Sequence, residues 1–221
     1  MYVPDHFRTS HSDILDLLTN FGAAELVTNT PDGLRATMLP MIYEAATADP
    51  DADIERLEGD LGVLRGHFAR KNDHWQKEAL GQALVIINGP DAYITPTWYA
   101  TKREHGRVVP TWNYITAHVY GELTVHDDVA WVETNVRELT HKYEARRNPR
   151  WAVTDAPPEY IYGQLRAIVG VEITVTRVDT KWKLSQNRSL DDVMGVVEGV
   201  AADGRKDMAE AVRRAAVGRD R

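Results

Sequence analysis

The side chains best suited to binding a ligand lie between residues 83 and 123. Two apolar runs, at 84–87 and 92–94, lead into the segment TPTWY, and a basic loop and a long alternating segment follow. Aromatic rings, hydroxyls, an amide and several cations are therefore close together in the sequence. Rings stack on planar ligands and cations pair with phosphate. The pattern predicts a site for a flat aromatic ligand that carries a phosphate.

Residues 108–125 alternate in polarity. The odd positions are apolar, namely Ile115, Ala117, Val119 and Leu123. The even positions are amphipathic, namely Trp112, Tyr114, Thr116, His118, Tyr120 and Glu122. This alternation is typical of a strand with one face on a core. The other face is either a ligand wall or subunit interface, or an ordinary solvated sheet face, because aromatic residues favour strands.

Two further segments carry groups that a phosphorylated ring would need. Arg70 and Lys71 lie between a predicted strand end and a predicted helix start, where backbone N–H groups and cations bind phosphate. Residues 183–188 combine amides, a hydroxyl and cations, and amides can pair with the edge of a flavin or pyrimidine-like ring. Each segment also has a structural interpretation: a solvated charged turn for the first, and helix capping by Asn187 or Ser189 for the second.

The composition excludes several kinds of site. The chain of 221 residues has no cysteine, which excludes disulfides, thiolate catalysis, Cys-ligated zinc and iron–sulfur clusters. It also lacks the Gly-rich dinucleotide motif, the P-loop and the Gly-x-Ser-x-Gly motif. His67 and His74, or His118 and His126, do not have the spacing of helical zinc ligands. No metal site is predicted.

Charge and hydropathy indicate the compartment and the partners. Neither a signal peptide nor an apolar run of membrane-spanning length is present, so we expect a cytoplasmic protein with no membrane contact. The net charge of −7 argues against a surface that is basic all over, as nucleic-acid binding favours. Positive charge is local, at 102–107, 142–150, 181–188 and 205–214. Such clusters can meet DNA, a ligand phosphate or a helix C-terminus.

The elements that must position these groups are mostly strands. Strands are expected at 24–29, 34–44, 61–69, 84–87, 92–94, 108–125 and 168–178. Helices are expected at 13–21, 74–80, 129–143, 190–197 and 205–217. In the fourth helix, after Ser189, the expected apolar side consists of Leu190, Val193, Met194 and Val197. The acidic segment 45–60 is expected to be a surface excursion.

The order of these elements bears on the fold class. The helices do not alternate strictly with the strands, which favours an antiparallel barrel with helices outside over a doubly wound sheet. We therefore expect a mostly β or α+β fold. The predicted organisation is a single domain over residues 1–200 and a helical tail over 201–221.

Several sequence blocks together resemble the PaiB family. They are MYVPDHF, LPMIYE, GHFARKNDHW, ALVIINGPDAYITPTWY, VPTWNY with His118 following, and KLSQNRS. The resemblance runs from residue 1 to about residue 200 with the blocks in order, and VPTWNY and KLSQNR are its specific motifs. One departure is Asp73, which stands where the family block is expected to have proline.

The resemblance implies a fold, a cofactor and a role. The fold is a split β-barrel of the pyridoxamine-phosphate-oxidase type with peripheral helices. The cofactor is FMN, held at the interface of a homodimer, and the role is that of a negative transcriptional regulator. A flavin-dependent oxidoreductase, such as a flavin reductase or an oxidase, is the alternative, and a flavin-binding module without turnover is the third possibility. No residue is assigned to catalysis, although His118 and Tyr114 are candidates if a substrate lies over the flavin.

The expected FMN contacts follow from the chemistry of each side chain. For the phosphate they are Arg70, Lys71 and Lys102, with Asn72 in the same block as the first two. For the isoalloxazine ring and its polar edge they are Thr95, Trp112, Asn113, Tyr114, Gln186 and Asn187. His67 and His118 are further contacts.

Overall fold

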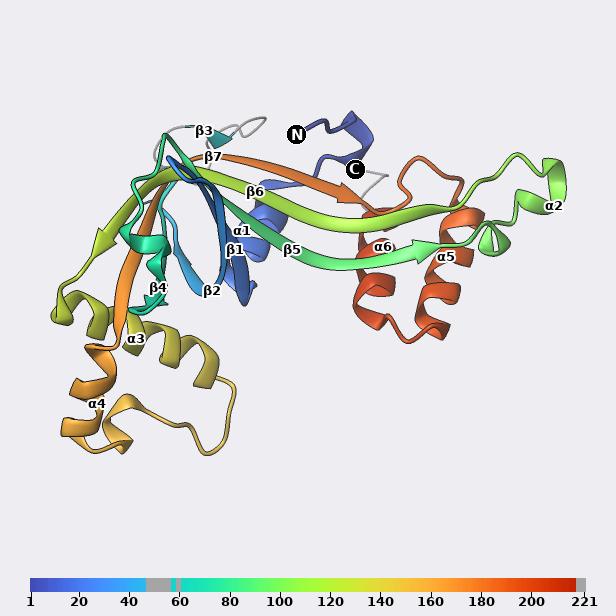
Figure 1. The fold of residues 1–221 in the computed structure, drawn as a ribbon. Coiled ribbons are helices and arrows are strands. Elements are labelled where there is room, and N and C mark those ends of the chain that lie inside the picture. The colour runs from blue at the N-terminus through green and yellow to red at the C-terminus, as the bar shows by residue number, and fades with distance from the viewer. Residues whose placement is uncertain (47–56, 59–60, 218–221) are drawn as a thin grey trace. The chain divides into compact units, whose positions relative to one another are not determined.

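The computed structural model describes residues 1–46, 57–58 and 61–217 (Figure 1). The strands are β1 (Ala23–Thr30), β2 (Gly33–Glu44), β3 (Leu57–Glu58), β4 (Val63–Ala69), β5 (Ala83–Ile94), β6 (Thr111–His126) and β7 (Ile168–Lys183). The α-helices are α1 (His11–Asn20), α2 (Lys102–His105), α3 (Val129–Glu144), α4 (Pro158–Leu165), α5 (Leu190–Ala202) and α6 (Lys206–Val217). Short 3-10 turns are η1 (Asp5–Phe7), η2 (Asp73–Gln76), η3 (Pro96–Trp98) and η4 (Val153–Asp155).

The strands form one sheet that closes on itself. Their order is β3-β7-β4-β2-β1-β5-β6, and β7 also pairs with β6. The pairs β1–β2, β1–β5, β2–β4, β3–β7 and β4–β7 are antiparallel. Closure removes the free sheet edges that would otherwise invite aggregation. The predicted fold class, a split β-barrel with peripheral helices, is confirmed.

Contacts divide the chain into two compact units. Unit 1 comprises Met1–Ile14, Asn88–Ala117 and the chain from residue 180 onward. Unit 2 comprises Leu15–Ile87 and His118–Asp179. The boundaries fall inside α1, β5, β6 and β7, so these elements run from one unit into the other.

The core of unit 2 follows the predicted alternation. Along β7 the buried residues are Val169, Val171, Ile173 and Val175, each at 0% exposure. Burying one such side chain contributes about 1.5–3 kcal/mol. The β1–β2 hairpin is also as predicted, and Gly33 after its turn has a φ of 102°, which glycine adopts without strain.

In unit 1, α5 and α6 pack against each other. Ser189 caps α5 as predicted, with its Oγ accepting from the Asp192 backbone N–H. The predicted apolar side of α5 is only half right, because Leu190 and Met194 are exposed. The buried side is instead Val193, Val196, Val197 and Val200. The buried side differs from the predicted one because α6 and the turn η3 pack on this helix.

Other expectations need correction. The predicted helix at 74–80 is only the single turn η2, because Lys77 is already extended (φ −90°, ψ 129°). The runs at 84–87 and 92–94 belong to one continuous strand, β5. No helix is among those expected at 158–165, yet α4 forms there, because Pro158 is tolerated at the first helical position, where no N–H bond is lost. The acidic segment 45–60 lies largely outside the described residues.

The described residues contain neither a membrane-spanning helix nor a cluster of metal ligands. None of the described helices is both long enough and apolar enough to cross a bilayer. Within the same residues, no three His, Asp or Glu side chains gather in a way that could hold a metal ion.

Candidate functional site

The loop after β7 is built around the buried side chain of Asn113. Asn113 is 1% exposed, and its Nδ2 donates to the Ser185 hydroxyl at 3.0 Å. Ser185 has a φ of 67°, a left-handed conformation that a non-glycine residue adopts at a cost. Gln186 folds back on the same loop: its Oε1 accepts from the Leu184 N–H at 2.7 Å, and its Nε2 donates to the Trp182 carbonyl at 2.6 Å. The amides of Asn113 and Gln186 therefore order this loop.

Next to this loop, unit 1 presents an aromatic surface. Trp112 and Tyr93 are 48% and 50% exposed and meet edge to face, with ring centroids 6.1 Å apart. Tyr114 is half-buried, with the ammonium groups of Lys181 and Lys183 5.8 and 6.0 Å from its ring centroid. Burial lowers the pKa of Lys183, and repulsion from the charge of the nearby Lys181 adds to this effect. Exposed rings beside cations can accept a planar anionic ligand.

The segment between β5 and β6 carries uncommitted positive charge. Thr95 follows the last residue of β5 and caps the turn η3, where its Oγ1 accepts from the Thr97 N–H at 3.3 Å. The exposed cations Lys102, Arg103 and Arg107 follow on and after α2. Across the described residues, no carboxylate pairs with any of these three. They are free to meet an external anion.

Helix α5 holds this segment in place. Asp192 accepts from both the backbone N–H and the hydroxyl of Thr101, at 2.9 and 2.8 Å. Trp98 lies in a groove made by two glycines one turn apart: a Cβ on Gly195 would be 2.0 Å from the Trp98 carbonyl oxygen, and one on Gly199 would be 2.3 Å from its ring. Position 102 is thus set by contacts with α5.

The Arg70 side chain in unit 2 already forms hydrogen bonds with other residues of the chain. Its guanidinium pairs with both oxygens of Asp127 and donates to the carbonyls of Arg166 (2.7 Å) and Ile168 (3.1 Å). Hydrogen bonds from Arg70 hold the pKa of Asp127 below its usual value. A phosphate at Arg70 would have to compete with these acceptors, whereas neighbouring Lys71 is exposed and has no such partner among the described residues.

Asn72 and His74 belong to a buried polar cluster in the same unit. The Asn72 Oδ1 accepts from the His74 backbone N–H at 3.0 Å, so Asn72 caps η2. The His74 ring is 2% exposed and lies between two hydroxyls, with Nε2 2.8 Å from the Thr28 Oγ1 and Nδ1 2.8 Å from the Thr37 Oγ1. Both ring nitrogens therefore have partners inside the barrel.

The predicted contacts separate into groups. Within unit 1, the structure gathers Trp112, Asn113, Tyr114 and Gln186 around the loop after β7, with Thr95 and Lys102 on the β5–β6 segment and Asn187 exposed. The others, His67, Arg70, Lys71, Asn72 and His118, lie in unit 2. Lys183 lies in the predicted segment 183–188 but is not among the individual contacts predicted, and its Nζ donates to the Thr111 hydroxyl and the Trp112 carbonyl. Its place in the KLSQNR block was the available signal.

Because three histidines of unit 2 have lowered pKa values, we expect the protein to lose stability in mild acid. Burial lowers the pKa of His67, His74 and His118, so the folded state binds fewer protons than the unfolded state, in which histidine has a pKa of about 6.5. Their stabilising contribution is complete above that pH and is lost as pH falls toward the lowered values. Urea midpoints should therefore fall between about pH 6.5 and 5, above the range where carboxylates titrate. A flat profile in this window would contradict the expectation, and His74→Gln should reduce the slope.

Comparison with known proteins identifies the class. A family model described as "Putative FMN-binding domain" matches residues 1–177. The fold is shared with the FAD and heme binding protein from Mycobacterium smegmatis (TM-score 0.53, 15% identity, covering 90% of this chain and 80% of that one). It is also shared with the flavocytochrome Anf3 from Azotobacter vinelandii (TM-score 0.56, 10% identity, covering 85% and 74%). The class is that of flavin-binding split barrels.

Relatives in sequence narrow this class to a family. The Protease synthase and sporulation protein PAI 2 of Bacillus subtilis is 32% identical over 200 residues, which cover 90% of this chain and 88% of that protein. An uncharacterised protein of Emericella nidulans is 32% identical over 214 residues, 81% of each chain. The chain belongs to the PaiB family of FMN-binding proteins, and FMN as its cofactor is confirmed at the level of the family.

Proposed function

We propose that this cytoplasmic protein holds FMN at the interface of a homodimer and acts as a negative transcriptional regulator of the PaiB type. The observation that carries the FMN site is the surface of unit 1, where the exposed ring of Trp112 and the half-buried ring of Tyr114 lie beside lysines. The cations Lys102, Arg103 and Arg107, which pair with no carboxylate in the described part of the chain, belong to the same unit. A planar ring system with a phosphate tail needs both kinds of group.

The residues of unit 1 fit the cofactor in a defined way. The ring of Trp112 would lie against the isoalloxazine, and Lys102 would pair with the phosphate. Asn113 and Gln186 act indirectly, because they hold the loop that follows Lys183 and carries Asn187. Bound FMN supplies reversible redox chemistry, and the protein supplies binding and electrostatics.

Exposed apolar side chains in unit 1 support the dimer. Tyr93, Val109 and Trp112 are 50%, 64% and 48% exposed. Exposed apolar clusters on a protein surface mark sites where a ligand or another chain binds. A second copy that covers these side chains would also close the FMN site against water.

Two measurements test cofactor and assembly together. The purified protein should be yellow, should release FMN on denaturation, and should elute in light-scattering chromatography with twice the 24.9 kDa mass of one chain. A colourless protein that takes up no FMN would refute the cofactor assignment. A flavin-loaded monomer would refute the interface and leave the cofactor standing.

Lys102→Ala is expected to weaken FMN binding about tenfold or more, because a charge-assisted contact to phosphate contributes about 1.5–3 kcal/mol. Thermal stability should not change, since Lys102 is exposed and unpaired among the described residues. Fluorescence titration of the apoprotein with FMN measures the effect. Lys206→Ala, an exposed lysine on α6, is the matched control, and equal affinities for the two variants would remove Lys102 from the site.

A flavin-dependent oxidoreductase is the second candidate, with His118 as its candidate proton acceptor. Burial lowers the pKa of His118, so its imidazole is neutral at pH 7 and can accept a proton. Rapid bleaching of the bound flavin by NADH or NADPH would support this function. Absence of bleaching, together with salt-sensitive and sequence-specific DNA retardation, would support the regulator.

A further inference from the structure

One face of unit 1 carries aromatic rings and ammonium groups on two paired strands. Trp112 and Tyr114 are two residues apart on β6, so their side chains lie on the same side of that strand. Asn113, between them, is 1% exposed and points to the other side. The paired strand β7 presents Lys181 and Lys183 beside Tyr114, with their ammonium groups 5.8 and 6.0 Å from its ring centroid. We call these two rings and two lysines the ring face.

The N-terminal segment, residues 1–8, is attached to the ring face through Lys181. The Lys181 Nζ donates to the Tyr2 carbonyl oxygen at 3.2 Å. The same nitrogen lies 5.8 Å from each of three ring centroids, those of Tyr2, Phe7 and Tyr114. A cation is attracted to the face of an aromatic ring. One ammonium group therefore joins two rings of the N-terminal segment to a ring of β6, and all of these residues belong to unit 1.

The N-terminal segment has a buried anchor and an exposed ring. Phe7 is 6% exposed and ends the turn η1, in which its N–H donates to the Pro4 carbonyl at 2.9 Å. The Tyr2 side chain, by contrast, is 82% exposed, although the Tyr2 backbone is held by Lys181. The segment is thus fixed at two points while its outermost ring has little cover. A ring that is positioned in this way, next to other rings, is suited to stacking on a planar ligand.

A single planar ligand can reach both Tyr2 and Tyr114. Their ring centroids are each 5.8 Å from the same Lys181 nitrogen, so the two centroids are separated by no more than twice this distance. A fused three-ring system such as isoalloxazine is long enough to span that separation. Within the described chain, neither Lys181 nor Lys183 pairs with a carboxylate. The charge beside the rings is therefore positive, which favours an anionic aromatic ligand.

On the basis of the FMN site proposed for unit 1, we propose that the N-terminal segment is a flap of that site. Tyr2 stacks on the isoalloxazine ring, and Lys181 is the positioning residue that holds the flap against the ring face. None of the expected FMN contacts lies in residues 1–8. A flap held by a hydrogen bond and by ring contacts can open to admit the cofactor and then close over it.

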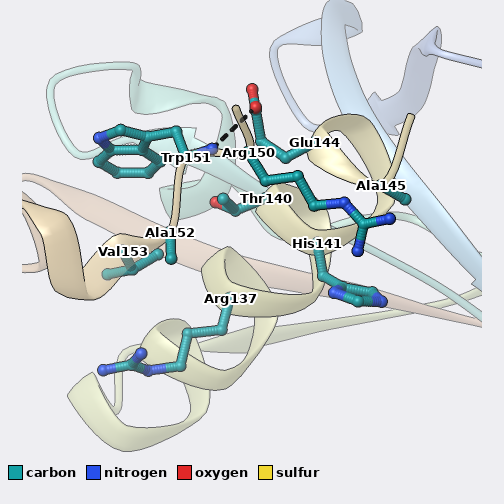
Figure 2. A pocket seen from close by; sticks show the side chains of 9 residues that line it. All are labelled: Arg137, Thr140, His141, Glu144, Ala145, Arg150, Trp151, Ala152 and Val153. Carbon is teal, nitrogen blue, oxygen red and sulfur yellow. Dashed lines mark hydrogen bonds between the residues drawn. The ribbon is translucent and has the colours of Figure 1, made fainter. Parts of the chain in front are cut away.

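Tyr2→Ala is expected to weaken FMN binding about fivefold or more, as removal of a ring that stacks on a base usually does. Tyr2→Phe should bind as tightly as the wild type, because the ring and not the hydroxyl makes the contact. Trp151→Ala is the matched control and should leave the affinity unchanged. Its ring is 46% exposed, but it lines a pocket beside α3 in unit 2 (Figure 2). Fluorescence titration of each apoprotein with FMN measures the affinities.

The outcomes separate the flap from the cofactor site. If the wild type binds FMN and Tyr2→Ala binds it equally well, Tyr2 is not a contact and the flap is refuted, while the cofactor site stands. An equal loss in Tyr2→Ala and Trp151→Ala also refutes the flap. A wild-type protein that binds no FMN refutes the cofactor site, and the flap with it.

Cleavage by chymotrypsin after Phe7 measures the opening of the flap directly. Phe7 is buried, so this bond is cut only while the segment is open. In the apoprotein, Lys181→Met should speed the cleavage about fivefold or more, whereas Lys181→Arg, which keeps a donor and a cation, should behave as the wild type. Saturating FMN should slow cleavage of the wild type. Unchanged cleavage in Lys181→Met, or no protection by bound FMN, would overturn the proposal.

Discussion

Replacing His74 with alanine is expected to lower the free energy of unfolding by about 2–5 kcal/mol. The ring is 2% exposed, packs 5.2 Å from the Phe68 ring, and bonds through its two nitrogens to Thr28 on β1 and Thr37 on β2. Truncation leaves a cavity and removes the partner of two hydroxyls. Urea unfolding at pH 7.5, where the imidazole is neutral, measures the loss.

The control for this substitution is Gln76→Ala in the same turn. Gln76 is exposed, so its removal should change stability by less than about 0.5 kcal/mol. A double variant of His74 with Thr28→Val should lose less than the sum of the single losses, because the two share one hydrogen bond. An effect of His74→Ala no larger than that of the control would show that the cluster contributes little to the barrel.

Gly199→Leu is expected to weaken FMN binding strongly and to destabilise unit 1 by about 1–3 kcal/mol. A Cβ at this position would lie 2.3 Å from the Trp98 ring, so the ring must leave its groove on α5. Trp98 and Thr101 anchor the segment that carries Lys102. The substitution therefore shifts Lys102, the proposed phosphate contact, without changing the Lys102 side chain itself. FMN titration and thermal unfolding measure the two effects.

Gly163→Leu supplies the matched comparison. Gly163 is also a helical glycine, on α4, and a Cβ built there meets nothing within 4 Å. Leucine at this position should be tolerated or mildly stabilising, because glycine is a poor helix former. If Gly199→Leu retains normal FMN affinity while Lys102→Ala loses it, the segment does not depend on α5 for its position.

The strands were predictable because their signal is local. In β7 a period of two residues places Val169, Val171 and Ile173 on one face, and no distant residue can change that parity. The same holds for Ile115 and Val119 in β6. The buried side of α5 was less predictable, since it depends on which other elements pack against the helix. The pair Gly195 and Gly199, four residues apart, was the available sign of a close approach.

The site was harder to predict because its polar side chains have competing partners. Gln186 can pair with a ring edge or with its own backbone, and only the folded loop brings the Trp182 carbonyl within reach. Arg70 meets Asp127, 57 residues later, a pair that no short motif encodes. Asp73, where the family block was expected to have proline, pairs with Arg35 at 3.0 Å. That contact depends on a carboxylate that proline lacks.

The bond between Thr101 and Asp192 has a consequence for the growing chain. The two residues are 91 positions apart, and ribosomes add about 5–20 residues per second. Thr101 is therefore made roughly 5–18 s before the carboxylate that anchors it. During that interval the groove beside Gly195 and Gly199 does not yet exist, so the Trp98 ring cannot be packed there. The segment that carries Lys102 can therefore reach its final position only after α5 has been made.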